Sequence, residues 1–383
     1  MQSNSRYRYT VFLRTLIAIS LLLTVTIYSR TNAKVLWAQS ETDYPIYVPI
    51  LLNKAGWMPP PESFDLVYAD GAGAWLSSLD GKYKSFLGAN VQYGIEDDIP
   101  VVRAAPGGSY VAVQYANGWT IYQRNTLAIA AGIGQGFALA WDQPQHTNDV
   151  QTGQMLTSLL LSKKGTGINR WTLANQQSTP LLVTSDDTSD HSPLWDASGA
   201  RLFFAHHEFG GTLYVTMVKQ FSEVLLPYAG ENRDAVKIND EFTLLEEVDS
   251  WHDQPIAFHL SADQQKLIFA AKQTIYVVDL TTKAAVTITP PGFGEKEAGR
   301  SVDFHNDQIL YGAADGIYVV GLSGHGDRRV VEGSNLHYPQ WTASGEQIVY
   351  RGTDNRLYVV DADGSNSHVI PYTAAVKQFD ILK

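Results

Sequence analysis

The sequence contains no cysteine among its 383 residues. A chain without cysteine cannot build a disulfide framework or a thiolate metal site, and it cannot use a cysteine nucleophile. The absence does not assign the protein to the cytoplasm, because many exported proteins have no disulfides. The 44% hydrophobic content is typical of a folded globular chain.

Several catalytic motifs are also missing. The sequence has no G-x-S-x-G nucleophile elbow, no H-E-x-x-H pair, no P-loop and no dinucleotide-binding fingerprint. The acidic run Asp186–Asp190 lacks the glycine and the distal glutamate of a calcium loop. The adjacent His206 and His207 would face opposite ways on a strand, so they could not easily share a metal. We therefore expect no cofactor and no metal, and we assign no catalytic residue.

Basic residues are outnumbered by acidic ones. The chain has 28 Lys and Arg against 39 Asp and Glu, and its net charge is −11. Such a polyanion repels phosphate backbones and anionic lipid headgroups alike. We expect no nucleic-acid partner.

Residues 1–33 resemble an export signal. An arginine-containing start precedes the apolar run Leu16–Tyr28, and small residues follow at Thr31–Ala33. The alternative is an uncleaved anchor, although the run is shorter than the roughly 20 residues that a spanning helix needs. In both cases the remainder faces outside, so we expect an extracytoplasmic protein that is secreted, periplasmic or at the cell surface. A membrane would be a partner only through this segment.

Residues 34–63 form a second region of distinct composition. They include the run Pro59–Pro61, and proline runs favour extended geometry and cannot lie inside a sheet. We expect a proline-rich linker here, followed by a folded domain over residues 64–383.

That domain is predicted to be built from groups of four short strands. The clearest group is His337–Pro371, in which apolar runs alternate with Gly-Asp-Asn turns of the kind that hairpins need. Six similar groups precede it, and the first of them lacks its first strand. In the fourth group we expect the last strand at Phe221–Pro227, followed by a tail without repeat character, Tyr228–Asp253. The groups are Phe64–Leu87, Ile99–Gly134, Phe137–Thr184, His191–Pro227, Gln254–Thr289, Arg300–Glu332 and His337–Pro371.

A period of four strands predicts an all-β fold, a β-propeller of four-stranded blades. Seven blades are expected, or six if Phe64–Leu87 lies outside the ring. After the seventh group, Ala375–Lys383 has the pattern of a first strand. We predict that this C-terminal strand pairs with the partial N-terminal blade and closes the ring, which removes exposed sheet edges.

Two stretches carry a family resemblance. PLWDASGARLFF in the fourth group and PQWTASGEQIVY in the seventh resemble the TolB-like, or PD40 (WD40-like), propeller repeat. The family's usual S-P-D-G turn is replaced here by D-A-S-G and T-A-S-G. The resemblance implies a propeller fold, and it implies little about role, because the family includes interaction proteins, sensor domains and substrate-gating domains.

A candidate site follows from the propeller geometry. The first strand of each blade lines the central channel, and the residues four positions before the first-strand aromatic, or its equivalent, would surround one mouth. In the second to seventh groups these are Asp98, Phe137, His191, Gln254, Arg300 and His337. We predict that the polar members, Asp98, His191, Gln254, Arg300 and His337, bind a ligand.

The features together favour a non-catalytic binding module. Its partner would be a protein, a peptide or a glycan recognised by the propeller face. The alternative is a glycan-acting hydrolase or lyase that uses Asp98, His191 and His337 at the channel mouth. The sequence leaves ligand identity and oligomeric state open.

Overall fold

The computed structural model describes most of the chain from Phe64 onward. All described residues lie in one compact unit, Pro60–Lys383. The expected signal (1–33) and linker (34–63) lie outside them, so those boundaries stay predictions. The described residues are 64–93, 101–134, 138–141, 158–163, 167–182, 188–196, 201–208, 213–219, 240–242, 258–271, 273–282, 284–291, 293 and 302–383.

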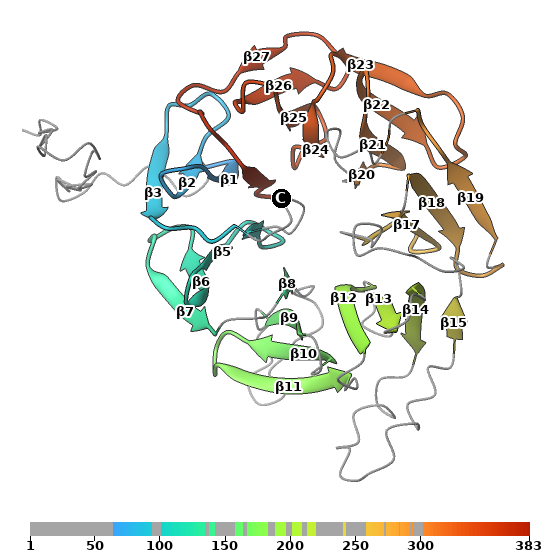
Figure 1. Ribbon diagram of the computed structural model, residues 1–383, viewed down its shortest axis with the longest axis horizontal. Coiled ribbons are helices and arrows are strands. Elements are labelled where there is room, and N and C mark those ends of the chain that lie inside the picture. The colour runs from blue at the N-terminus through green and yellow to red at the C-terminus, as the bar shows by residue number, and fades with distance from the viewer. Residues whose placement is uncertain are drawn as a thin grey trace, which may run out of the picture. The chain divides into compact units, whose positions relative to one another are not determined.

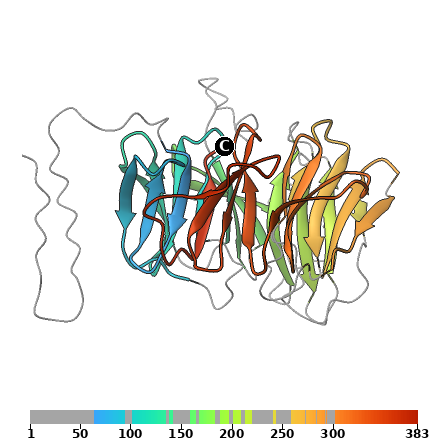
Figure 2. The same ribbon diagram turned by 90° about the horizontal axis from the view of Figure 1, so that it is seen from above.

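Seven four-stranded antiparallel sheets are formed by these residues, which confirms the predicted fold class. Figure 1 shows the sheets arranged around a circle as blades, and Figure 2 shows the same strands from the side. From the inner to the outer strand, blade 1 is β28 (Gln378–Ile381), β1 (Leu66–Ala69), β2 (Ala74–Ser77) and β3 (Lys84–Gly88); blade 2 is β4 (Val102–Ala104), β5 (Tyr110–Tyr115), β6 (Gly118–Gln123) and β7 (Ile129–Ile133); blade 3 is β8 (Ala138–Trp141), β9 (Ser158–Lys163), β10 (Gly167–Thr172) and β11 (Gln177–Leu182); blade 4 is β12 (Thr188–Trp195), β13 (Arg201–Glu208), β14 (Leu213–Lys219) and β15 (Asp240–Phe242); blade 5 is β16 (Phe258–Leu260), β17 (Lys266–Ala271), β18 (Thr274–Asp279) and β19 (Ala285–Ile288); blade 6 is β20 (Val302–His305), β21 (Gln308–Ala313), β22 (Gly316–Gly321) and β23 (Arg328–Glu332); blade 7 is β24 (His337–Trp341), β25 (Gln347–Arg351), β26 (Leu357–Asp361) and β27 (His368–Val369).

Blade 1 contains strands from both ends of the domain. β28 pairs antiparallel with β1, with Phe379 opposite Tyr68 and Asp380 opposite Val67. The predicted closure by the C-terminal strand is confirmed. Blade 1 then packs on both neighbours: Val67 belongs to a core cluster with Val102 of blade 2, and Tyr68 belongs to one with Val349 of blade 7.

The strands are apolar on both faces because each blade is covered on both sides. In β18, Ile275 and Val277 pack in one cluster with Ile309 of blade 6. The next residue, Val278, faces the opposite way and packs in a cluster with Phe203 of blade 4. This alternation explains why a strand such as IYVV shows no polar face.

The turn between β24 and β25 illustrates the local chemistry. Gly345 has a φ of 71° and donates its N–H to the Thr342 carbonyl at 2.9 Å. A Cβ at this position would collide with the His305 ring of blade 6. Glycine meets both demands, the left-handed backbone and the close approach.

One element of the sequence prediction was wrong. The outer strand of blade 4 is β15, Asp240–Phe242, which pairs with β14 through Val215 opposite Phe242. It falls inside the segment expected to be a tail, while Phe221–Pro227 lies outside the described residues. A three-residue strand with two acids is too short to show an alternating pattern.

Candidate functional site

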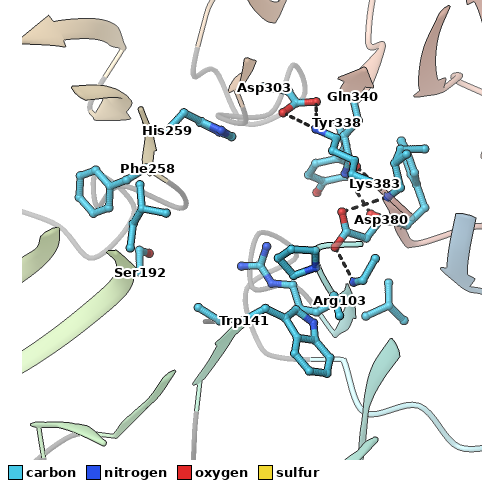
Figure 3. Close-up of a pocket in the computed structure, with 18 of the residues that line it drawn as sticks. Arg103, Trp141, Ser192, Phe258, His259, Asp303, Tyr338, Gln340, Asp380 and Lys383 are labelled. Atoms are coloured by element: carbon cyan, nitrogen blue, oxygen red, sulfur yellow. Dashed lines mark hydrogen bonds and ion pairs between the residues drawn. The ribbon is translucent and has the colours of Figure 1, made fainter. Parts of the chain in front are cut away.

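A cavity of about 420 Å³ lies at the centre of the ring. All seven inner strands contribute to its lining, so residues far apart in the sequence meet there (Figure 3). Its volume is in the range of pockets that hold small ligands. The cavity is therefore the candidate site.

At one equivalent position in each inner strand, a residue lines the cavity, and these seven residues divide into two groups. Blades 5, 6, 7, 1 and 2 supply the polar ones, which we term the polar arc: His259, Asp303, Gln340, Asp380 and Arg103. Blades 3 and 4 supply the apolar ones, which we term the apolar arc: Ala140 and Leu194. The cavity thus has a polar side and an apolar side.

Two polar-arc residues form hydrogen bonds that join blade 1 to its two neighbours. Gln340 of β24 accepts the Ile381 N–H through Oε1 at 3.1 Å and donates Nε2–H to the Phe379 carbonyl at 3.2 Å. Asp380 of β28 accepts the Ala104 N–H of β4 through Oδ2 at 2.8 Å. These bonds tie the closing strand to blades 7 and 2.

Two further residues continue the pattern. Asp303 of β20 accepts the Trp341 N–H of β24 through Oδ2 at 2.7 Å. His259 of β16 lies with Nε2 3.1 Å from the Val302 carbonyl of β20. Because a carbonyl only accepts, Nε2 carries the proton in this contact. Each residue therefore reaches the inner strand of the next blade.

Asp303 also forms an ion pair with Lys383. The Lys383 ammonium lies 2.7 Å from Oδ2 and 2.9 Å from Oδ1, and the side chain of Asp303 is only 7% exposed. Burial works against ionisation, but the attraction of Lys383, the attraction of His259 in its charged form and the hydrogen bonds outweigh it. The pKa of Asp303 is lowered as a result.

Burial shifts the other titratable groups of the polar arc. Desolvation lowers the pKa of Arg103, and the attraction of Asp380 opposes that shift. Desolvation raises the pKa of Asp380, against the opposing effects of Arg103 and the Ala104 N–H. Desolvation likewise lowers the pKa of His259, although Asp303 favours its charged form. His259 is accordingly neutral at pH 7.

Two lining residues have an unusual backbone. Ser192 and Tyr338 both have a φ of 52° and both precede a proline, in the sequences His191-Ser192-Pro193 and His337-Tyr338-Pro339. Irregularities in pairing occur at both places. A left-handed residue before proline is sterically disfavoured, and such positions concentrate at functional sites. Both residues line the cavity.

Two of the five predicted site residues, His191 and His337, are among the residues that the structure describes. His337 lies on β24 opposite Arg351, with its ring 5.9 Å from that of Tyr338, and His191 lies on β12 opposite Ala205. In both strands the cavity lining begins one residue later, at Ser192 and Tyr338. Asp98, Gln254 and Arg300 lie outside the described residues. That the five residues surround one mouth of the channel and bind a ligand stays a prediction.

The polar arc was not expected from the sequence. Its signal is a single polar residue inside a short apolar strand, as in F-H-L, V-D-F and F-D-I. The prediction took Phe258 as the equivalent of Trp341. In the structure Leu260 pairs with Leu267 as Trp341 pairs with Ile348, so Leu260 is the true equivalent and the predicted register of blade 5 was shifted by two residues.

No group of three or more His, Asp or Glu among the described residues has the geometry to hold a metal ion. No helix in the described ranges is long and apolar enough to cross a membrane.

Comparison with known proteins gives the fold alone. No protein-family model and no curated protein matches the sequence. A chain of the crystal structure of the mitotic checkpoint complex is 13% identical with a TM-score of 0.51, over 87% of this chain and 99% of that one. Dihydro-heme d1 dehydrogenase NirN in complex with DHE is 13% identical with a TM-score of 0.50, over 85% and 76%. TolB from Acinetobacter baumannii is 12% identical with a TM-score of 0.43, over 82% and 65%. Membership of the TolB-like or PD40 family stays a prediction.

Proposed function

We propose that this protein is an extracytoplasmic binding module that receives its ligand in the central cavity. The observation that carries the proposal is the convergence of all seven inner strands on one cavity with a polar and an apolar side. Concave sites of this size with a few placed polar groups are the usual form of a binding site. The basic start and apolar run of residues 1–33 support the extracytoplasmic location.

The polar groups of the cavity favour binding over catalysis. Asp303 and Asp380 each accept a backbone N–H from the next blade, and Asp303 is paired with Lys383 as well. A carboxylate fixed in this way is poorly placed to exchange protons with a substrate. The ligand we propose is a peptide or a glycan, or the exposed end of a protein chain.

One observation favours the alternative, a glycan-acting enzyme. The pKa of Asp380 is raised while that of Asp303 is lowered, and two carboxyl groups shifted in opposite directions are typical of an acid and base pair. Turnover of a glycan that is lost on Asp380→Asn substitution, with the fold intact, would establish this reading in place of the first.

The binding proposal is tested with the full chain on arrays of peptides and glycans. Ala140→Phe fills part of the cavity from the apolar side without touching the polar arc, and we expect it to abolish capture. The matched control is Ile129→Phe on the outer strand β7, where the side chain is 67% exposed. Equal capture by both variants would refute a ligand site in the cavity.

Location is tested separately. Protease added to intact cells, or to spheroplasts, should degrade the protein, and N-terminal sequencing of the extracted chain should show whether the segment 1–33 has been removed. A protein that resists protease until the cells are lysed would refute the extracytoplasmic location.

A further inference from the structure

Arg103 differs from the other members of the polar arc. It lies on β4 opposite Ala112, at the boundary where the polar arc meets the apolar arc of blade 3. The inner strand of blade 3 presents Ala140, whose side chain has no acceptor. Arg103 is therefore the one polar-arc residue whose equivalent in the next blade has an apolar side chain.

Arg103 has a donor that is not used within the described part of the chain. Its Nε is buried and has no hydrogen-bond partner there. Asp380, which attracts the guanidinium, directs Oδ2 to the Ala104 N–H. Buried polar groups in folded proteins are almost always hydrogen-bonded, and an exception requires an explanation. A cation in this position is suited to an anionic ligand.

The other cationic groups of the cavity are already engaged or uncharged. Lys383 is held by both oxygens of Asp303. Burial lowers the pKa of His259, so that its ring is neutral, and it donates to the Val302 carbonyl. Arg103 is thus the cation that remains for a ligand among the described lining residues.

The surface beside Arg103 is apolar. Ala140 of blade 3 and Leu194 of blade 4 line the cavity, and Trp141 of β8 lies on the same side of the cavity as Arg103 in Figure 3. The indole N–H of Trp141 also has no partner among the described residues. A ligand that pairs with Arg103 would therefore lay an apolar body against blades 3 and 4.

We propose that Arg103 binds the carboxylate of the ligand, and that the ligand is a monocarboxylate with an apolar body. This inference rests on the proposed function, because it names the chemistry of the ligand in the same cavity. The planar guanidinium offers paired N–H donors that match the two oxygens of a carboxylate. A free organic acid and the C-terminal residue of a peptide both present this group.

Titration calorimetry on the full chain tests the proposal with matched acids and amides. The probes are hexanoate against hexanamide, and N-acetyl-leucine against its amide; the first pair represents a free acid and the second a peptide end. We expect each bound acid to bind at least about tenfold more tightly than its amide. Arg103→Gln should abolish that preference, because it lacks the charge, and Arg103→Lys should reduce it, because it keeps the charge and lacks the planar fork.

The control variant is Arg329→Gln on the outer strand β23, whose side chain is 40% exposed and paired with Asp315. It should bind as the unsubstituted protein does. Without ligand, Arg103→Gln should change the melting temperature little, because it removes a desolvated charge but also the charge that stabilises the buried Asp380 carboxylate. A clear fall in melting temperature in both Arg103 variants would make Arg103 a structural residue and overturn the proposal.

The remaining outcomes separate this inference from the proposed function. Equal binding of acids and amides, no binding of either acid, or a preference that survives in Arg103→Gln would each overturn it. Binding of neutral ligands that Ala140→Phe blocks would at the same time leave the binding module standing. Conversely, acid binding that depends on Arg103 in a protein found inside the cell would refute only the location.

Discussion

The two sides of the cavity join their blades by different means. On the polar side, Asp303, Gln340 and Asp380 each accept a backbone N–H from the next inner strand. On the apolar side, Ala140 and Leu194 have no side-chain donor or acceptor, and blades 3 and 4 are joined by packing in a cluster that includes Leu160 and Trp195. Directional bonds fix the register between blades, whereas apolar contact fixes only their separation.

This difference shows which polar groups of the cavity support the presence of a ligand and which are explained by the fold. Most of the polar arc is explained by the ring itself, since its members satisfy backbone groups that would otherwise be buried without partners. Arg103 is not explained in this way. A polar cavity is therefore weaker support for binding than a single polar residue with a buried donor that finds no partner among the described residues.

Removal of β28 is expected to have the largest effect, because it deletes an inner strand of the polar arc that is bonded to blades 7 and 2. A chain that ends after Ala374 should fail to fold, since the edge of β1 and the core cluster of Phe379 and Ile381 would be exposed. Circular dichroism and limited proteolysis measure this. Lys377→Ala, an exposed position at the start of the same segment, is the control and should fold normally.

Asp303→Ala should give the next largest effect. It leaves the Trp341 N–H and the Lys383 ammonium without their partner, and hydrogen bonds to a charged group contribute about 1.5–3 kcal/mol. Lys383 is 40% exposed and regains water, which keeps the loss within that range. Urea denaturation measures the change, and the exposed Asp327→Ala should show none.

Acidification should destabilise the polar side through His259. Its folded pKa lies below the unfolded value of about 6.5, so the stabilisation is complete above that pH and is lost as the pH falls toward the folded pKa. One proton gives a slope of at most about 1.4 kcal/mol per pH unit. Denaturation at several pH values should show a shallower decline in His259→Gln, and no change of slope in the exposed His325→Gln.

The carboxyl groups of Asp303 and Asp380 change the stability of the fold in opposite directions at lower pH. The lowered pKa of Asp303 adds to the loss of stability on further acidification, because its stabilisation disappears as the pH falls through the folded pKa. The raised pKa of Asp380 has the opposite sign, since protonation relieves a buried charge. Asp380→Asn removes the opposing contribution, so stability should fall more steeply on acidification in that variant, and an unchanged slope would contradict this assignment.

Gln340→Leu should give the smallest effect of the set. It removes two hydrogen bonds to β28 and adds apolar surface, so we expect a loss of about 1 kcal/mol. Leu194→Met on the apolar side conserves volume and involves no hydrogen bond, and it should cost less. If both substitutions cost the same, the directional bonds of the polar side contribute nothing beyond packing.

The blades and the ring closure could be predicted from the sequence, whereas the residues that line the cavity could not. Turn residues and apolar runs are local signals, and the surplus strand in Ala375–Lys383 followed from counting them. The outer strand β15 left no such signal, because three residues carry no period. The polar arc depends on which residue of each inner strand faces inward, and that is set by pairing between strands rather than by the residue itself.

The shared blade has a consequence for how the protein is made. β1 is the first strand of the ring to leave the ribosome and β28 is the last of its strands, so Tyr68 acquires Phe379 as its neighbour only after synthesis has passed all the other blades. Until then blade 1 lacks its inner edge, so a prematurely ended chain presents an open sheet that proteases can recognise. Completion of the ring therefore requires that the whole domain, through β28, has been synthesised.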